Sequence, residues 1–356
     1  MNSPASSIFP FEGSAFEELL HRLRSDLQQS IVVTAHRGPD GDALGSALGF
    51  AHHLRSVGFS NVQVILPDGF PAFYNWMPGA SEILLFDTSE AKATSALQLA
   101  DWVFCLDYND LRRLGAPMES VVESSEGLKV LIDHHMHPTE FADYSFSDAT
   151  CGSTAELIFR WVVAAGEQEA LKIPVGSCLY TGVMTDTGSF RFPSVSPATH
   201  RMVAQLIEIG VDHASIHSAV YDSQRLDRLR LTGYAISEKL EVDMERACAW
   251  VSLTNEELTR FQAVSGDTEG LVNQALSIDG INCALFIRET PEGRVKMSLR
   301  SRGKFSVREV AEAHFNGGGH HNAAGGAVEN STAAEVVALW KSLLPQYGEA
   351  MKQSVS

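Results

Sequence analysis

The pattern of apolar and polar positions in the first part of the chain predicts buried strands. Four short apolar runs each end in polar residues, and they occupy residues 31–36, 61–66, 102–108 and 129–135. Continuous apolar runs of this length are typical of strands that are covered on both faces of a parallel sheet. The segment "DALGSALGFAHHLRSVGF" between the first two runs repeats apolar residues at helical spacing, so the pattern predicts a β-α-β unit.

Helical patterns dominate the middle of the chain. They occur in "STAELIFRWVVAAG", "GSCLYTGVMTDTG" and "PATHRMVAQLIEIG", and a long polar-rich stretch over residues 213–240 follows. A strand-like alternation then begins near "RACAWVSLT" and continues through "INCALFIRET" and "GRVKMSLRSRG". The last helical pattern is "STAAEVVALWKSLL", in which Thr332 and Glu335 have the spacing of a capping box.

These patterns predict an α/β protein with two domains. We expect an N-terminal doubly wound, mostly parallel sheet over residues 15–212, a connecting helix over residues 213–240, and a smaller C-terminal α/β domain over residues 241–346. The length of 356 residues supports this division, because a single hydrophobic core rarely serves a chain of that size.

Composition and charge narrow the class of protein. The chain has 44% hydrophobic and 20% charged residues, and none of its apolar runs is long enough for a membrane span. Its first residues lack the pattern of a secretory signal, so we expect a cytoplasmic protein. Its five scattered cysteines lack a C-x-x-C pair, which disfavours a disulfide framework and a thiolate zinc site. The net charge of −17 repels long polyanions, so we expect short phosphate substrates and no long duplex nucleic acid as a partner. A membrane partner is not expected either.

Polar residues with metal-binding chemistry stand at or just after the predicted strands. They are His36, Asp40, Asp42, Asp107, Asp133, His134 and His135, and a further acid, Asp186, stands where a helical pattern breaks into "DTGSF". Ligands of open α/β sheets bind at the carboxyl ends of the strands. Singly, each acid has a structural explanation, such as a helix cap at Asp42 or turns at Asp40 and Asp107. Together, crowded carboxylates repel one another and require cations.

The types of ligand indicate which cations these would be. Imidazoles and carboxylates without thiolates suit Mn²⁺, and also Mg²⁺, Co²⁺ or Zn²⁺. Six ligands from this set, four acids and two histidines, are too many for one protein-bound ion that keeps an open coordination position. They fit two metals about 3.5–4 Å apart, an arrangement that generates hydroxide and binds the oxygens of a phosphoryl group.

The motifs resemble those of a known family. "HRGPDGDALGS", "LDYND", "LIDHH" and "TDTGSF" resemble, in order, the four motifs of the DHH phosphoesterase superfamily, and "FNGGGHHNAAGGAV" is similar to the glycine-rich signature of the accompanying DHHA1 domain. These motifs bracket residues 32–327. A two-domain chain without appended modules resembles most the bifunctional oligoribonuclease/pAp phosphatase group, the nanoRNases.

This resemblance implies roles for individual residues. One Mn²⁺ is expected on His36, Asp40 and Asp107, and the other on Asp42, Asp107, His134 and Asp186, with Asp107 bridging. Mg²⁺ or Co²⁺ is an alternative to Mn²⁺. His135 is expected to contact the scissile phosphate, and Asp133 to orient the histidine pair.

Further residues are expected to bind the substrate in a cleft between the two domains. The glycine run Gly317, Gly318 and Gly319, with His320 beside it, is expected to grip a phosphate, although a turn is its structural alternative. Arg300 is expected to face the nucleotide, and Arg191 is a second candidate for a phosphate contact. A solvated surface charge is the alternative for each arginine.

The leading hypothesis is a Mn²⁺-dependent phosphodiesterase that hydrolyses very short RNAs and linear dinucleotides, with pAp 3′-phosphatase as a second activity. The alternatives are a cyclic dinucleotide phosphodiesterase, an exopolyphosphatase or pyrophosphatase, and a silent nucleotide-binding module. The "GGGH" segment disfavours the pyrophosphatase branch, and the filled ligand positions disfavour the silent module. The sequence leaves open the preferred substrate, the metal and a homodimeric state.

Overall fold

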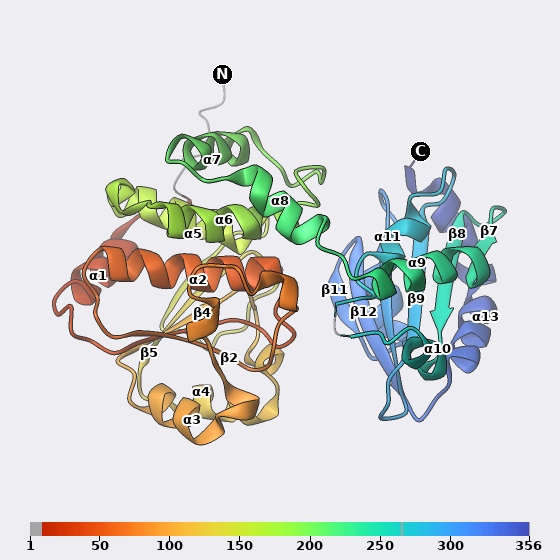
Figure 1. Cartoon of the computed structure of the whole chain (residues 1–356), viewed down its shortest axis with the longest axis horizontal. Helices are drawn as coiled ribbons and strands as arrows, with labels where there is room; N and C mark the ends of the chain where they lie inside the picture. Colours follow the sequence, from red (N-terminus) through yellow and green to blue (C-terminus); the bar gives the residue numbers. More distant parts are fainter. Residues whose placement is uncertain (1–8, 265, 356) are drawn as a thin grey trace. The chain divides into compact units, whose positions relative to one another are not determined.

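The computed structural model describes residues 9–264 and 266–355 (Figure 1). The chain divides after Ser223 into two compact units. In the described part of the chain, we find no helix with both the length and the apolar character that crossing a membrane requires.

The first unit contains a six-stranded sheet in the order β3-β2-β1-β4-β5-β6. Every neighbouring pair of strands is parallel. The strands are β1 (Ile31–Thr34), β2 (Val62–Leu66), β3 (Leu84–Leu85), β4 (Trp102–Leu106), β5 (Leu128–Asp133) and β6 (Tyr144–Ser147). The four predicted strands are therefore confirmed, and the two short edge strands β3 and β6 are additions to the prediction.

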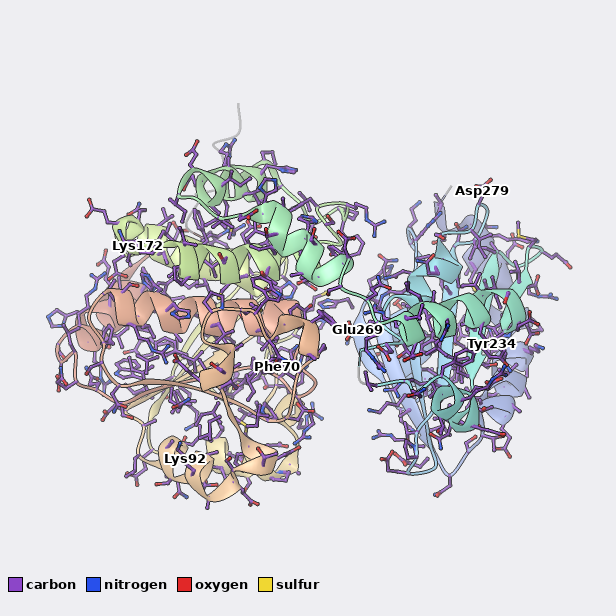
Figure 2. All side chains as sticks on the ribbon, viewed as in Figure 1. Phe70, Lys92, Lys172, Tyr234, Glu269 and Asp279 are labelled. Atoms are coloured by element: carbon purple, nitrogen blue, oxygen red, sulfur yellow. The ribbon has the colours of Figure 1, made fainter. Side chains whose placement is uncertain are left out.

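Helices cover both faces of this sheet, as the doubly wound fold predicts (Figure 1). One face carries α1 (Ser14–Leu23), α2 (Gly41–Ser56), α5 (Thr154–Ala164) and α6 (Ile173–Asp186), and the other carries α3 (Glu90–Gln98) and α4 (Ala116–Ser124). In β1, Val33 packs into the first core and Val32 into the second. Charged side chains such as Lys92 and Lys172 extend from the outer surface of the unit (Figure 2).

Two further helices, α7 (Pro197–Glu208) and α8 (His213–Tyr221), pack on α6 and complete the first core. Short 3₁₀ helices lie between the larger elements of the chain: η1 (Ala72–Tyr74), η2 (Ala80–Glu82), η3 (Phe86–Thr88), η4 (Leu111–Leu114) and η5 (Gln168–Ala170). A last one, η6 (Gln353–Val355), follows α13 (Ala333–Lys352).

Helices α2 and α6 approach each other closely because glycines line their contact. A Cβ atom at Gly45 would lie 2.6 Å from the carbonyl oxygen of Cys178 and 2.7 Å from the backbone nitrogen of Gly182. The backbones therefore touch at this crossing. This contact brings the first turn of α2, with Asp42, toward the last turn of α6, with Asp186.

The second unit is built on a mixed six-stranded sheet in the order β11-β12-β10-β9-β8-β7. Only β8 and β9 pair in parallel, and the other pairs are antiparallel. The strands are β7 (Leu240–Asp243), β8 (Cys248–Leu253), β9 (Cys283–Glu289), β10 (Arg294–Ser301), β11 (Gly318–His320) and β12 (Ala323–Glu329). The predicted second α/β domain is confirmed.

One face of the second sheet packs on α9 (Leu226–Glu238) and α11 (Leu271–Leu276), and the other on α12 (Val307–His314) and α13 (Ala333–Lys352). Helix α10 (Asn255–Arg260) follows β8. The predicted capping box at the start of α13 is present, because Thr332 and Glu335 exchange side-chain and backbone hydrogen bonds.

The segment over residues 213–240 is not one connecting helix. Helix α8 ends at Tyr221 and α9 begins at Leu226. Between them, the Ser223 hydroxyl donates to the carbonyl oxygen of Ala219, which provides a side-chain partner at the end of α8. The helix therefore breaks inside the segment for which we expect a continuous connection.

Candidate metal centre

Asp40 stands at the junction between β1 and α2. As the N-cap of α2, its Oδ1 accepts hydrogen bonds from the N–H groups of Asp42 (3.0 Å) and Ala43 (3.1 Å). Its second oxygen, Oδ2, lies 4.0 Å from Nε2 of His36. The structural explanation for Asp42 as the helix cap is therefore wrong, because Asp40 performs that role.

Asp42 is buried at the centre of the cluster, with 1% of its surface exposed. It accepts hydrogen bonds from the backbone N–H groups of Thr154 (2.6 Å) and Ala155 (2.9 Å) at the start of α5. Burial, followed by the negative charges of Asp107 and Asp186, raises the pKa of Asp42 well above its usual range. A nearby cation would offset the cost of ionising this carboxylate.

Asp107 links the two histidines of the cluster. Its Oδ2 lies 3.4 Å from Nε2 of His36, and its Oδ1 lies 3.5 Å from Nε2 of His134. Oδ1 also accepts a hydrogen bond from the Thr154 hydroxyl at 3.0 Å. The residue has a left-handed backbone conformation, with a φ of 63°, which costs a non-glycine residue about 1–3 kcal/mol. This strained position is the one expected to bridge the metals.

His134 and Asp186 complete the cluster. Nε2 of His134 lies 3.4 Å from Oδ2 of Asp186 and 3.9 Å from Oδ2 of Asp42, whereas Nδ1 lies 3.3 Å from the carbonyl oxygen of Cys151. A proton on Nδ1 that points at this carbonyl leaves Nε2 available as a metal ligand. Burial raises the pKa of Asp186 to about 6.

The charges of the cluster fit two divalent metals. Burial lowers the pKa of His36 and His134, but the hydrogen bonds with Asp107 and the surrounding carboxylates outweigh it, and both pKa values are raised. Burial raises the pKa of Asp107, but the hydrogen bonds with His134 and His36 lower it well below its usual range. The cluster thus favours positive charge on its nitrogens. Ligand atoms of His36, Asp40 and Asp107, and those of Asp42, His134 and Asp186, lie within 4.8 Å of one another in each group.

His135 has a different environment from His134. Its Nδ1 lies 2.7 Å from Oδ1 of Asp133, and its backbone N–H donates to Oδ2 of the same carboxylate at 3.0 Å. Its Nε2 accepts a hydrogen bond from Nη1 of Arg113 at 2.8 Å. Both ring nitrogens therefore have partners in the protein, although ligand atoms of Asp107, His134 and His135 also lie within 4.8 Å of one another.

Three residues that support the cluster were missed by the reasoning from sequence. Thr154 contacts the cluster directly, Arg113 contacts His135 beside it, and Arg37 holds the loop that carries His36. The Arg37 guanidinium pairs with Asp87 at 2.7 and 2.8 Å, which joins this loop to the end of β3. The only sequence signal for Thr154 is its place at the start of a predicted helix, and that pattern does not indicate its partners.

Arg191 belongs to the same unit as the cluster. It follows a turn in which Gly188, Ser189 and Phe190 are all left-handed, with φ values of 57°, 60° and 64°. Its Nε donates to the carbonyl oxygen of Gly188 at 2.8 Å. The turn begins two residues after Asp186, so Arg191 stands on a backbone that is constrained next to the cluster. Its predicted phosphate contact stays a prediction.

The other predicted substrate residues lie in the second unit. Arg300 is on β10, where its Nη1 donates to the carbonyl oxygen of Leu299 at 2.9 Å. Gly318 and His320 are the ends of strand β11, which pairs with β12, and Gly317 precedes the strand. The glycine run is therefore the edge of a sheet instead of an open loop or a simple turn.

Packing requires a glycine at some positions of this run but not at all of them. A Cβ atom at Gly317 would lie 2.0 Å from the carbonyl oxygen of Gly325, and one at Gly319 would lie 2.6 Å from that of Ala323. Close pairing with β12 thus explains both glycines. A Cβ atom at Gly318 would meet no atom within 4 Å, so packing does not explain why a glycine stands there.

Comparison with known proteins identifies the family. Residues 30–183 match the model of the DHH family, N-terminal domain, and residues 252–345 match that of the DHHA1 domain. The chain is 30% identical, over 83% of its length and 83% of the relative's, to the bifunctional oligoribonuclease and PAP phosphatase NrnA of Thermus thermophilus. The chain belongs to the DHH/DHHA1 phosphoesterase family. The resemblance of its motifs is thereby confirmed.

Two further proteins are also similar to this chain. An exopolyphosphatase-related protein from Bacteroides fragilis has a crystal structure with a TM-score of 0.89 and 38% identity, over 95% of this chain and 96% of the other. The cyclic-di-AMP phosphodiesterase GdpP of Geobacillus thermodenitrificans is 24% identical over 93% of this chain, which spans half of that protein. Family membership and the His/Asp cluster support a requirement for divalent metals.

Proposed function

We propose that this protein hydrolyses very short oligoribonucleotides and linear dinucleotides to mononucleotides, with two Mn²⁺ ions in the cluster around Asp107, and that it removes the 3′-phosphate from pAp. The observation that carries this proposal is the convergence of imidazoles and carboxylates from four separate segments in one cluster around Asp107. The name of the Thermus thermophilus relative supports the choice of substrates.

The proposed metal ligands are the residues that the resemblance to the DHH motifs implies. His36, Asp40 and Asp107 would hold one ion, and Asp42, Asp107, His134 and Asp186 the other. Two such metal ions would supply an activated water and stabilise negative charge on phosphoryl oxygens. Mn²⁺ is the metal that we propose, because the ligands combine imidazoles and carboxylates without a thiolate.

The other residues of the site orient groups of the chain and of the substrate. Asp133 fixes the imidazole of His135 through Nδ1, so this ring keeps one orientation beside the cluster, and its phosphate contact stays a prediction. Thr154 donates from its backbone to Asp42 and from its hydroxyl to Asp107, which orients two proposed ligands from the start of one helix.

A substrate panel tests this function. Purified protein with Mn²⁺ should release mononucleotides from a 5′-phosphorylated dinucleotide, and chelation of the metal should abolish the release until Mn²⁺ is restored. Parallel reactions with pAp, a cyclic dinucleotide, polyphosphate and pyrophosphate rank the alternatives. Hydrolysis of a cyclic dinucleotide, polyphosphate or pyrophosphate without cleavage of the linear dinucleotide would refute the proposed substrate class.

A second candidate is the hydrolysis of cyclic dinucleotides. The similarity to a protein named cyclic-di-AMP phosphodiesterase favours it, but this chain spans only half of that protein. We place it second for this reason. Faster turnover of a cyclic than of a linear dinucleotide at equal concentration would reverse the order.

Metal binding should weaken as the pH falls. The pKa values of His36 and His134 are raised, and that of Asp186 is about 6, so protons increasingly occupy the ligand atoms below neutral pH. Each proton that a metal displaces lowers the apparent affinity about tenfold per pH unit below the pKa. We therefore expect the Mn²⁺ affinity to fall at least about tenfold between pH 8 and pH 6. Calorimetric titrations at pH 6, 7 and 8 measure it, and an affinity that does not change with pH would contradict the assigned ligands.

A further inference from the structure

Arg113 occupies a fixed place between three loops of the metal centre. It lies in η4, just after β4, and its carbonyl oxygen accepts a hydrogen bond from the backbone N–H of Arg37 at 2.8 Å. Its own backbone N–H donates to the carbonyl oxygen of Asp110 at 3.0 Å. The backbone therefore joins the loop after β4 to the loop that follows β1.

The side chain of Arg113 reaches the third of these loops, after β5. Its Nη1 lies 2.8 Å from Nε2 of His135. A guanidinium only donates hydrogen bonds, so Nε2 of His135 must accept, and its Nδ1 then carries the proton that points at Asp133. Arg113 and Asp133 thus fix both the orientation and the tautomer of this imidazole.

The guanidinium lies beside the cluster and has no carboxylate partner in the described part of the chain. Nδ1 of His135, the ring that it contacts, is 3.8 Å from Oδ1 of Asp107, and the charge of Arg113 also acts on His36. Among the described residues, Arg113 forms no ion pair within 4.0 Å, and its only side-chain hydrogen bond is the one to His135. The neighbouring Arg112, in contrast, pairs with Asp110 and has 79% of its side chain exposed.

We propose that Arg113 binds a non-bridging oxygen of the substrate phosphate, next to His135 and the metal cluster. A guanidinium has five N–H donors in a planar fork that matches the oxygens of a phosphate. The bond to His135 uses one of these donors and keeps the group in place for the others. This inference rests on the proposed function, since it names a further contact for the phosphate that the cluster would hydrolyse.

The surroundings explain why such a cation is needed. The chain has a net charge of −17, and the cluster itself contributes several carboxylates, so a phosphate anion requires positive charge beyond that of the metals. A group at the edge of the cluster can meet the phosphate without displacing a metal ligand. Neutral His135 cannot supply this charge in the tautomer that Arg113 and Asp133 impose.

The test compares R113A, R113Q and R113K with R112A as the matched control. For the Mn²⁺-bound proteins we measure kcat and KM with a 5′-phosphorylated dinucleotide, and the binding of inorganic phosphate by calorimetry. We expect R113A and R113Q to lower kcat/KM about 10²-fold or more and to weaken phosphate binding about tenfold. R113K should recover at least about tenfold of the lost kcat/KM because it keeps the charge. R112A should stay within about twofold of the wild type.

The outcomes separate this inference from simpler explanations. A variant whose Mn²⁺ affinity is within about threefold of the wild type is folded. We expect this affinity for the Arg113 variants, because the hydrogen bonds by which Arg113 joins the two loops come from its backbone and survive a change of side chain. Unchanged phosphate binding by R113A or R113Q would overturn the proposal and leave Arg113 as a positioning residue for His135. An equal loss in R112A would overturn it as well. If the wild type leaves the dinucleotide intact, the proposed function fails, but the phosphate titration still decides the role of Arg113.

Discussion

Replacing Asp107 with asparagine should lower the turnover of a 5′-phosphorylated dinucleotide by at least about 10³-fold. Asp107 has one carboxylate oxygen near His36 and the other near His134, so its charge serves both proposed metals. Asparagine keeps the size of the side chain and tolerates the left-handed backbone conformation of this position. The substitution therefore removes mainly the negative charge. Steady-state kinetics, with Mn²⁺ stoichiometry measured in parallel, test the prediction.

Asp110→Asn is the matched control for this substitution. Asp110 also follows β4, but its side chain caps η4 and pairs with the exposed Arg112. Its loss should change the turnover by no more than about threefold, because exposed ion pairs contribute little free energy. Full activity of D107N with two Mn²⁺ bound would show that Asp107 does not bridge the metals.

The central strands could be predicted because they are buried on both faces. Strand β4, with the sequence "WVFCL", is apolar at every position and completely buried. The edge strands lack this signal. Strand β3 has only two residues, and in β6 the sequence "YSFS" alternates apolar and polar positions, as a strand exposed on one side does. Periodicity therefore indicates the middle of the sheet better than its margins.

The cluster of histidines and aspartates could be predicted because of a rule about parallel sheets. The carboxyl ends of neighbouring parallel strands meet at one edge, and β1, β4 and β5 are neighbours in the sheet. Polar residues that follow these strands must then lie close together, as His36, Asp107 and His134 do. No knowledge of side-chain conformation is required for this inference.

The supporting contacts depend on details that the same rule does not provide. Thr154 reaches Asp42 and Asp107 because α5 begins beside the cluster, and Arg113 reaches His135 across two loops. Neither contact has a characteristic spacing in the sequence. The glycine run is a similar case, since its pairing with β12 involves hydrogen bonds between backbones, which the side chains do not reveal.

The closeness of α2 and α6 should make Gly45 intolerant of a larger residue. A Cβ atom there would lie 2.6 Å from the carbonyl oxygen of Cys178 and within 2.9 Å of two backbone atoms of Gly182, so the helices would have to separate. Overpacking of this kind costs up to about 3 kcal/mol, and the better helix propensity of alanine offsets about 1 kcal/mol. We therefore expect Gly45→Ala to lower the free energy of unfolding of the first unit by about 2 kcal/mol in urea denaturation.

Separation of these helices should also displace residues of the candidate metal centre. Asp42 lies three residues before Gly45 on α2, and Asp186 lies four residues after Gly182 on α6, so both proposed ligands move with the crossing. We expect a measurable loss of Mn²⁺ affinity in the same variant. Gly233→Ala in α9 is the control, because a Cβ atom there meets nothing within 4 Å and should stabilise the second unit by about 0.5–1 kcal/mol. If Gly45→Ala matches the wild type in both unfolding and Mn²⁺ affinity, the contact between the two backbones is not what holds the ligands of α2 and α6 together.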